Sequence, residues 1–285
     1  MRLCRFGSDR LGVVDGDTVR DATKALDILP SYRHPLPGFD VLVANLEAIR
    51  GRIDAATRES PPIALTDVTL LSPIANPGKL IAAPVNYQRH LEEARGSAEL
   101  HHGNQVAAIR RAGLFLKATS SLTGAGQGIA LRTLDRRSDH EVELAFVIGQ
   151  RADRVARSDA LDYVAGYCIG LDITIRGPEE RSLRKSPDGY SVLGPWLVTA
   201  DEIPNPGALD LRLSVNGQVR QQSNTSDLIL GVGELIEYAS SFYTLYPGDV
   251  VFTGTPEGVG PIQPGDTITA CIEKIGTMQV NVRAA

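Results

Sequence analysis

The sequence predicts a strand-rich α+β fold, with a small N-terminal unit followed by a larger domain. Many short runs of β-forming residues are separated by turns that contain Gly and Pro. Residues 234–242 form the clearest amphipathic helix, whose apolar face carries Leu235, Ile236, Ala239 and Phe242. This mixture is typical of α+β domains. Two consecutive prolines, Pro61 and Pro62, indicate a linker. We therefore expect one domain at residues 1–60 and a second at residues 68–285.

In the N-terminal unit, turns at residues 7–9 and 15–17 separate short predicted strands, and the Asp-Gly pair at residues 15–16 favours a hairpin. Residues 40–53 have the apolar spacing of an amphipathic helix. The apolar positions are Leu42, Val43, Leu46 and Ile49.

In the larger unit, Ser158 is a predicted N-cap for a short helix that ends at Tyr163. Residues 88–111 are polar and only weakly periodic, which fits either a mobile lid or a pair of solvated helices. The predicted strands include residues 80–83, 167–174, 211–215, 249–252 and 267–273.

The composition excludes several classes of function. The chain has 285 residues, of which 42% are hydrophobic and 22% charged, which is an ordinary globular balance. A net charge of -5 argues against a nucleic-acid-binding face, and no apolar run is long enough to span a membrane. The three cysteines are odd in number and far apart, so free thiols in a reducing compartment fit best. We expect a cytoplasmic protein.

Two acids, Glu141 and Glu143, open a run that otherwise has the pattern of a buried strand. Side chains at i and i+2 of a strand share a face, here about 7 Å apart along the backbone. Adjacent ionised carboxylates repel each other unless a positive charge lies between them, and a hard divalent cation would supply it. The alternative is a solvated strand edge with two exposed acids. The opposite face belongs in a core and carries Val142, Leu144, Phe146 and Ile148.

A third carboxylate, Asp172, lies inside another apolar strand, where it is costly unless it is paired or metal-bound. Together with the two glutamates it would form an all-oxygen site suited to Mg²⁺, Mn²⁺ or Ca²⁺ rather than zinc. A turn-capping aspartate, or one paired with Arg176, is the alternative. Beside such a metal, Lys185 would bind a substrate carboxylate or stabilise an enolate, but on its own it fits an exposed surface charge as well.

His90 and Glu93 are neighbours if their segment is helical, because their spacing is i, i+3. A glutamate that accepts a hydrogen bond from one imidazole nitrogen makes the other a better base for activating water. A simple ion pair on an exposed helix is the alternative. The glycine-rich stretch at residues 254–260 fits a turn that approaches a small ligand, or a plain tight turn.

Taken in order, these segments resemble the fumarylacetoacetate hydrolase (FAH) family from about residue 71 to the C-terminus. Each segment is weak alone, and the ordered set is specific. The segments are residues 77–81, 86–93, 114–117, 120–124 and 141–145, Asp172, Lys185, and residues 193–196 and 246–256. The chain departs from the family pattern after Asp172, where only Arg176 matches, and in the short step from Asp172 to Lys185.

The resemblance implies roles for particular residues. Glu141, Glu143 and Asp172 match the metal ligands of the family, which hold Mg²⁺ or Mn²⁺. His90, Glu93 and Lys185 match its catalytic residues. Positions that contact substrate or line the pocket match Tyr87, Lys117, Arg176 and Thr255. The resemblance also implies a mixed β-sandwich roll as the core, a small N-terminal α+β domain, a homodimer, and a lid that closes on the substrate.

The leading hypothesis is metal-dependent hydrolysis of a carbon–carbon bond in an acylpyruvate-type 1,3-diketo acid, through a metal-bound enolate. The resemblance places such a reaction in the breakdown of aromatic compounds, with a small 2-oxo acid as the substrate. The same enolate would also serve an isomerase or tautomerase, a decarboxylase of an oxaloacetate-like acid, or a hydratase. A metal-binding protein without turnover is the third possibility.

Overall fold

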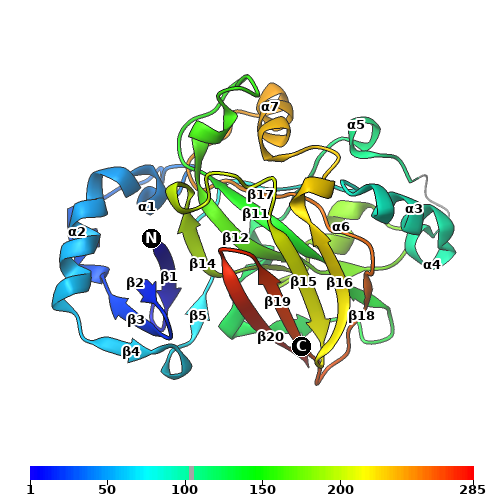
Figure 1. Ribbon diagram of the computed structural model, residues 1–285, viewed down its shortest axis with the longest axis horizontal. Coiled ribbons are helices and arrows are strands. Elements are labelled where there is room, and N and C mark those ends of the chain that lie inside the picture. Colours follow the sequence, from blue (N-terminus) through cyan, green and yellow to red (C-terminus); the bar gives the residue numbers. More distant parts are fainter. Residues whose placement is uncertain (103–105) are drawn as a thin grey trace.

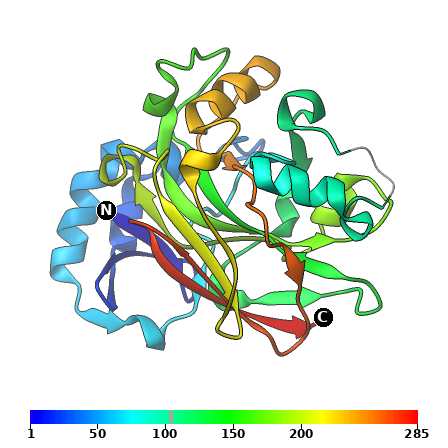
Figure 2. The ribbon, with the colours of Figure 1, turned by 45° about the vertical axis from the view of Figure 1, so that its right-hand side comes forward.

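The computed structural model describes residues 1–102 and 106–285 and has the predicted strand-rich α+β architecture (Figure 1). A large twisted sheet runs through the molecule, and a smaller sheet packs against one of its faces. Figure 2 shows the smaller sheet, drawn in yellow and red, lying across the green strands of the large sheet. Among the described residues, no helix is long and apolar enough to span a bilayer.

The large sheet joins strands from both ends of the sequence. Its strands are β1 Arg2–Phe6, β2 Arg10–Asp15, β3 Thr18–Asp21, β4 Pro62–Ala64, β5 Leu70–Leu71, β6 Leu80–Ala82, β7 Phe115–Lys117, β8 Leu122–Thr123, β11 Val142–Ile148, β12 Val164–Asp172, β14 Ser191–Thr199 and β17 Val250–Phe252. Their order is β4-β3-β2-β1-β14-β12-β11-β17-β6-β7, with β5 beside β1 and β8 beside β14.

Two smaller sheets complete the β-structure. The first has the order β16-β15-β19-β20-β9, and the second has the order β13-β10-β18. Their bounds are β16 Gln218–Asn224, β15 Asp210–Val215, β19 Thr267–Ile272, β20 Gly276–Ala284, β9 Ile129–Leu131, β13 Thr174–Ile175, β10 Ser138–His140 and β18 Gly260–Pro261. Asn216 and Gly217 both have positive φ, 51° and 80°, as a tight hairpin turn between β15 and β16 requires.

Helices cover the sheet faces and the site. The α-helices are α1 Val41–Ala44, α2 Leu46–Glu59, α3 Gln88–Gly96, α4 Ala98–His101, α5 Ile109–Ala112, α6 Arg181–Lys185 and α7 Val232–Phe242. The 3-10 helices are η1 Thr23–Ile28, η2 Leu65–Asp67, η3 Thr119–Ser121, η4 Ala125–Gln127, η5 Ala160–Tyr163, η6 Ala200–Glu202 and η7 Thr225–Asp227.

The core has two parts, one on each face of the large sheet. On one face, side chains of β11 such as Leu144 and Phe146 pack with Leu213 and Ile268 of the smaller sheet. On the other face, Ala145 and Val147 of β11 belong to a cluster that includes Ile49 and Ile53 of α2. The predicted core face of β11 is confirmed, and the second face is also buried. Glu141 and Glu143 therefore lie on a face that is closed to solvent.

The N-terminal strands extend the large sheet rather than forming a sheet of their own. Arg2 and Leu3 of β1 pair with Val198 and Leu197 of β14 in antiparallel register. Figure 1 shows these strands, in blue, with α2 curving around them at one side of the molecule. The division into domains at residues 1–60 and 68–285 stays a prediction, and the two units share one hydrogen-bonded sheet.

Several local expectations differ from the structure. The helix expected at residues 40–53 is interrupted at Asn45 and continues to Glu59, and Asp40 caps its start by accepting from the Val43 amide at 3.1 Å. Ser158 does not cap a helix; its hydroxyl contacts Asp159, and a 3-10 turn begins at Ala160. Phe242, expected on the buried face of α7, is 70% exposed because the helix ends there.

Candidate metal centre and active site

Three carboxylates from neighbouring strands meet at one end of the large sheet. Glu143 lies on β11, Asp172 ends β12, and Glu141 precedes β11, where its carbonyl accepts from the Asp172 amide at 2.9 Å. The antiparallel pairing of β11 with β12 brings these positions together. One oxygen from each carboxylate lies within 4.8 Å of the others, and all three residues are buried. The spacing inferred from the sequence is thus realised, with Asp172 as the third member.

Cationic side chains surround two of the three carboxylates. The ammonium of Lys185 donates to Glu141 at 2.7 Å, to Asp172 at 2.6 Å and to the hydroxyl of Thr174 at 2.7 Å. Lys117 also pairs with Asp172 and donates to the Tyr190 carbonyl at 2.9 Å. Lys185 is therefore buried inside the cluster, which overturns its alternative interpretation as a surface charge.

Arg176 links the cluster to a fourth acid. Its guanidinium donates to Glu141 at 2.8 Å and to Asp139 at 2.7 Å. Asp139 is fully buried and also pairs with Arg137 at 2.7 Å. Because Arg176 holds one oxygen of Glu141 and Lys185 holds the other, the Glu141 carboxylate has a fixed orientation.

Glu143 is the carboxylate without a cation in contact. Its carboxylate accepts from the Gly254 amide at 2.6 Å, and among the described residues no Lys, Arg or His nitrogen lies within 4.0 Å of it. Burial and the neighbouring charge of Asp172 raise the pKa of Glu143 well above its ordinary value. Burial acts the same way on Glu141, but Lys185 and Arg176 outweigh it and hold the pKa of Glu141 far below its usual range.

This donor set fits a hard divalent cation. Buried carboxylate oxygens are the ligands that Mg²⁺ and Mn²⁺ accept, whereas zinc sites in proteins are built mainly from Cys and His. A divalent cation would also supply the positive charge that Glu143 lacks. Glu141, Glu143 and Asp172 are the residues that would hold it.

A histidine–glutamate pair lies on the helix that covers the site. Nδ1 of His90 hydrogen-bonds to Glu93 at 2.8 Å, and the second oxygen of Glu93 accepts from the Gly258 amide at 2.9 Å. His90 is buried, and among the described residues none hydrogen-bonds to its Nε2. The Gly258 amide and Glu93 thus fix the orientation of the imidazole, and Nε2 is the nitrogen that could bind a reactant.

One cavity of about 70 Å³ connects this pair with the metal cluster. Its walls come from α3 and α4 with the residues that flank them, from Glu141 just before β11, and from α6. The residues around it include His90, Glu141, Arg176, Arg181, Arg184 and Lys185. Side chains of α3 and α4, together with Val106 and Ala107, thus line the cavity. The closing motion expected of residues 88–111 stays a prediction, and residues 103–105 lie outside the described part of the chain.

Three of the predicted substrate-binding residues lie outside the cavity wall. The hydroxyl of Thr255 donates to the Val142 carbonyl at 2.9 Å and accepts from the Gln221 amide at 2.7 Å. Tyr87 is buried, and its hydroxyl has no partner among the described residues. Lys117 is occupied by Asp172. Arg176 does line the cavity. A substrate-binding role for these four residues stays a prediction.

Asp139, Arg181 and Arg184 were not expected at the site. Asp139 had a usable signal, because it precedes Glu141 and Glu143 in the same two-residue alternation. Arg181 and Arg184 have helical i, i+3 spacing with each other and lie just before Lys185, but α6 is too short for its periodicity to be recognised in the sequence.

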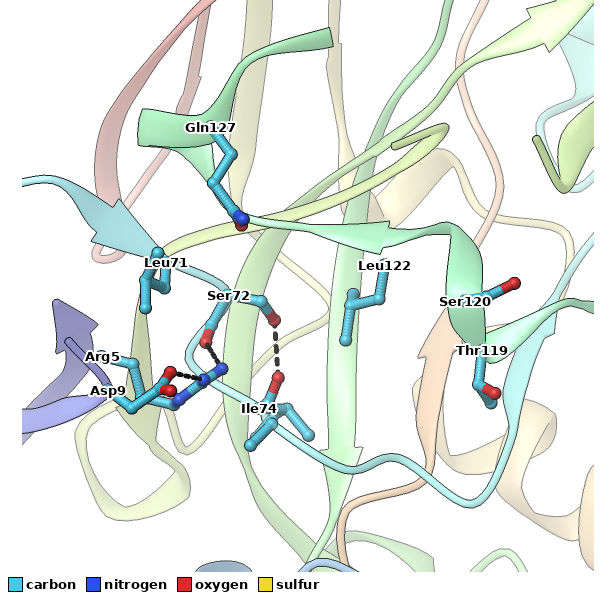
Figure 3. Close-up of a pocket in the computed structure, with 10 residues that line it drawn as sticks. Arg5, Asp9, Leu71, Ser72, Ile74, Thr119, Ser120, Leu122 and Gln127 are labelled. Atoms are coloured by element: carbon cyan, nitrogen blue, oxygen red, sulfur yellow. Dashed lines mark hydrogen bonds and ion pairs between the residues drawn. The ribbon is translucent and has the colours of Figure 1, made fainter. Parts of the chain in front are cut away.

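A larger cavity, of about 250 Å³, lies elsewhere in the molecule, between β1, β5 and the η3–β8 segment (Figure 3). Arg5 lies at its edge, bonded to Asp9 and to the Ser72 carbonyl. The wall combines small polar side chains such as Thr119 and Ser120 with apolar ones such as Leu71, and it carries neither the three carboxylates nor His90. Two further cavities, of about 390 and 470 Å³, are also larger than the one beside His90, so the site is identified by its chemistry and not by its size.

Comparison with known proteins gives a consistent result. The family described as fumarylacetoacetate (FAA) hydrolase C-terminal matches residues 79–283. A maleylpyruvate hydrolase of Aquipseudomonas alcaligenes is 61% identical over 286 residues and is covered completely, as is this chain.

Solved structures of similar proteins also match over the whole chain. A maleylpyruvate hydrolase from Sphingobium sp. SYK-6, solved in complex with manganese(II) ion and pyruvate, has a TM-score of 0.84 and 41% identity, with 100% of both chains covered. A probable 2-hydroxyhepta-2,4-diene-1,7-dioate isomerase from Mycobacterium abscessus has a TM-score of 0.78 and 30% identity, with 100% of this chain and 98% of that chain covered.

Proposed function

Because the chain belongs to the fumarylacetoacetate hydrolase family, we propose that it is a metal-dependent hydrolase that cleaves a carbon–carbon bond in an acylpyruvate. The observation that carries this proposal is one cavity lined by both a metal-ligand carboxylate, Glu141, and an oriented base, His90. The 61% identity to a maleylpyruvate hydrolase along the whole chain makes maleylpyruvate the first substrate to test.

The reaction adds water across the bond between C3 and C4 of the acylpyruvate. A new C4–O bond forms, the C3–C4 bond breaks, and the products are a carboxylic acid and pyruvate. When bound, a divalent metal acts as a Lewis acid on the 2-oxo acid end of the substrate. Glu141, Glu143 and Asp172 would hold that metal.

His90 would take a proton from the attacking water through Nε2. Glu93 accepts the Nδ1 hydrogen bond at 2.8 Å, which fixes the tautomer and increases the basicity of Nε2. The Gly258 amide holds Glu93 in turn at 2.9 Å. The pair thus has the arrangement of a general base with a positioning partner.

Lys185 would stabilise the negative charge that develops on the leaving pyruvate enolate. Its ammonium is already desolvated and held by Glu141, Asp172 and Thr174, so it costs little reorganisation when charge develops nearby. Arg176 would act by orienting Glu141. The carbon atom C3 of pyruvate takes up the proton that completes the reaction.

The proposal is tested by a substrate panel with purified protein, Mg²⁺ or Mn²⁺, and ultraviolet absorbance. We expect maleylpyruvate and a simpler acylpyruvate to lose their enol absorbance while pyruvate accumulates. Glu141→Ala and Glu143→Ala should abolish both metal binding and turnover. Pyruvate release that persists in metal-free protein would contradict the proposal.

An isomerase is the second candidate, favoured by the 30% identity to the probable isomerase from Mycobacterium abscessus. An isomerase protonates an enolate without adding water, so the water-activating pair separates the two reactions. If the chain is an isomerase, the panel should show isomerisation of a 2-hydroxydienoate without pyruvate release, and His90→Ala should spare it.

The chain acts on a small molecule, and we propose that it does so as a homodimer in the cytoplasm. The family resemblance supports the dimer. The three cysteines are free, and Cys4 and Cys168 are buried, as expected in a reducing compartment. Light scattering after size-exclusion chromatography tests the dimer, and a mass near that of a single 30.6 kDa chain would contradict it.

A further inference from the structure

One face of α6 turns three cations toward the active-site cavity. Arg181, Arg184 and Lys185 have the i, i+3, i+4 spacing that places side chains on one helix face, and all three line the cavity. Figure 1 shows α6 lying close to α3, the helix that carries His90. The cavity therefore has a strongly cationic wall.

Two of these cations form no ion pair with any described residue. Lys185 is bonded to Glu141 and Asp172. In contrast, among the described residues no carboxylate oxygen lies within 4.0 Å of the guanidinium of Arg181 or Arg184. The preceding acid, Glu180, instead caps the helix by accepting from the Ser182 amide at 3.5 Å.

Both guanidinium groups are nevertheless held in place. Arg184 donates to the carbonyls of Glu179 at 2.8 Å and Ile175 at 3.1 Å. Arg181 lies over the ring of Phe115, with its central carbon 5.4 Å from the ring centre. Held but unneutralised cations at a cavity wall are the arrangement expected of an anion subsite.

The electrostatics support this interpretation. Burial lowers the pKa of both Arg181 and Arg184, because the desolvation of each guanidinium outweighs the attraction of the acids around it, such as Glu141. Burial acts on Arg176 as well, but there Glu141 and Asp139 outweigh it and raise the pKa. Arg176 is thus satisfied within the protein, whereas the two α6 arginines are not.

The position of Arg181 fits the far end of a substrate. The ammonium of Lys185, which contacts the metal-ligand carboxylates, lies 5.7 Å from the centre of the same Phe115 ring. The ring thus bridges the metal end of the cavity and the unpaired guanidinium. An acyl chain of a few carbon atoms would span from one to the other.

We propose that Arg181, supported by Arg184, binds a second carboxylate at the end of the acyl chain, so that the enzyme selects dianionic acylpyruvates over monoanionic ones. This inference rests on the proposed function and specifies its substrate class. Arg181 is a specificity-determining residue here and takes no part in the bond-breaking step. Its planar group would hold the carboxylate through two parallel hydrogen bonds.

A binding experiment tests the subsite without turnover. Isothermal titration calorimetry of the Mn²⁺-loaded protein compares 2-oxoheptanedioate with 2-oxoheptanoate, which differ only by the terminal carboxylate. The wild type should bind the diacid at least about tenfold more tightly, the effect of one hydrogen bond to a charged group. Arg181→Gln should remove that preference, and Arg212→Gln, an exposed change on β15, should keep it. Equal binding of both ligands by the wild type would overturn the proposal.

Kinetics provide the second test. Arg181→Gln should lower kcat/KM for maleylpyruvate by at least about tenfold, mainly through KM, and leave kcat/KM for acetylpyruvate within about twofold. Arg181→Lys should recover part of the loss. Equal losses on both substrates, or none, would overturn the inference. If the wild type hydrolyses neither substrate, the proposed function fails, while the calorimetric comparison still decides whether the subsite exists.

Discussion

Replacing Glu143 by glutamine should stabilise the metal-free protein at neutral pH and destroy its metal site. Glu143 is 1% exposed and contacts no cation among the described residues. Glutamine keeps an oxygen that accepts from the Gly254 amide, now 2.6 Å from the carboxylate, and it removes the buried charge. The variant therefore separates the cost of the charge from the packing of the side chain.

The sign of the pH effect follows from the raised pKa of Glu143. Burial first, and then the charge of Asp172, make this carboxyl group bind its proton more tightly in the folded protein than in the unfolded chain. Its contribution to stability is full below the unfolded pKa and is lost as pH rises toward the folded pKa. The loss amounts to about 1.4 kcal/mol per pH unit within that window. The glutamine variant has no such loss, so its advantage over the wild type should grow at the same rate.

The assay is urea denaturation in the presence of a chelator, in steps between pH 4.5 and pH 8. Glu47→Gln is the matched control, because the Glu47 side chain is 92% exposed and its removal should leave the pH profile unchanged. Adding Mn²⁺ at about 100 times its Kd should stabilise the wild type by about 2.7 kcal/mol and leave Glu143→Gln unaffected. A variant that is less stable than the wild type by the same amount at every pH would refute the reasoning.

Three further changes probe the groups around the metal cluster. Lys185→Met should lower the unfolding free energy of the metal-free protein by about 3–5 kcal/mol, because it leaves two buried carboxylates without their shared cation. Urea denaturation measures this change, and a value below about 1 kcal/mol would contradict the buried pairing. His90→Ala should reduce hydrolysis by about 10²- to 10⁴-fold while Mn²⁺ affinity, measured by calorimetry, stays within about twofold. Glu93→Gln should give a smaller loss, and equal activity of the His90 variant and the wild type would remove the proposed base.

The parts of the site that follow a local rule were predictable from the sequence. Glu141 and Glu143 share a strand face because side chains alternate with a period of two, and His90 meets Glu93 because helix neighbours are three and four residues apart. Asp172 was recognised because a carboxylate inside an apolar strand needs a partner. Each of these inferences uses only a few consecutive residues.

The rest depends on how distant segments meet. Lys185 fits an exposed lysine in its own segment, and only the fold places its ammonium between Glu141 and Asp172. Arg181 becomes a candidate for anion binding only once the fold shows that no described carboxylate pairs with it, and no sequence pattern predicts this. The predicted burial of Phe242 was wrong, because its helix ends at that residue and the side chain stays exposed.

Hydrolysis in water enriched in ¹⁸O tests the central claim most directly. The protein, freed of metal and then reloaded with Mn²⁺, is given acetylpyruvate, and the released acetate is analysed by mass spectrometry. We expect one ¹⁸O atom per acetate and an equal amount of pyruvate, and only after the metal is restored. The Glu141→Ala variant should form neither product. Substrate consumption without labelled acetate, or labelled acetate from the metal-free protein, would contradict it.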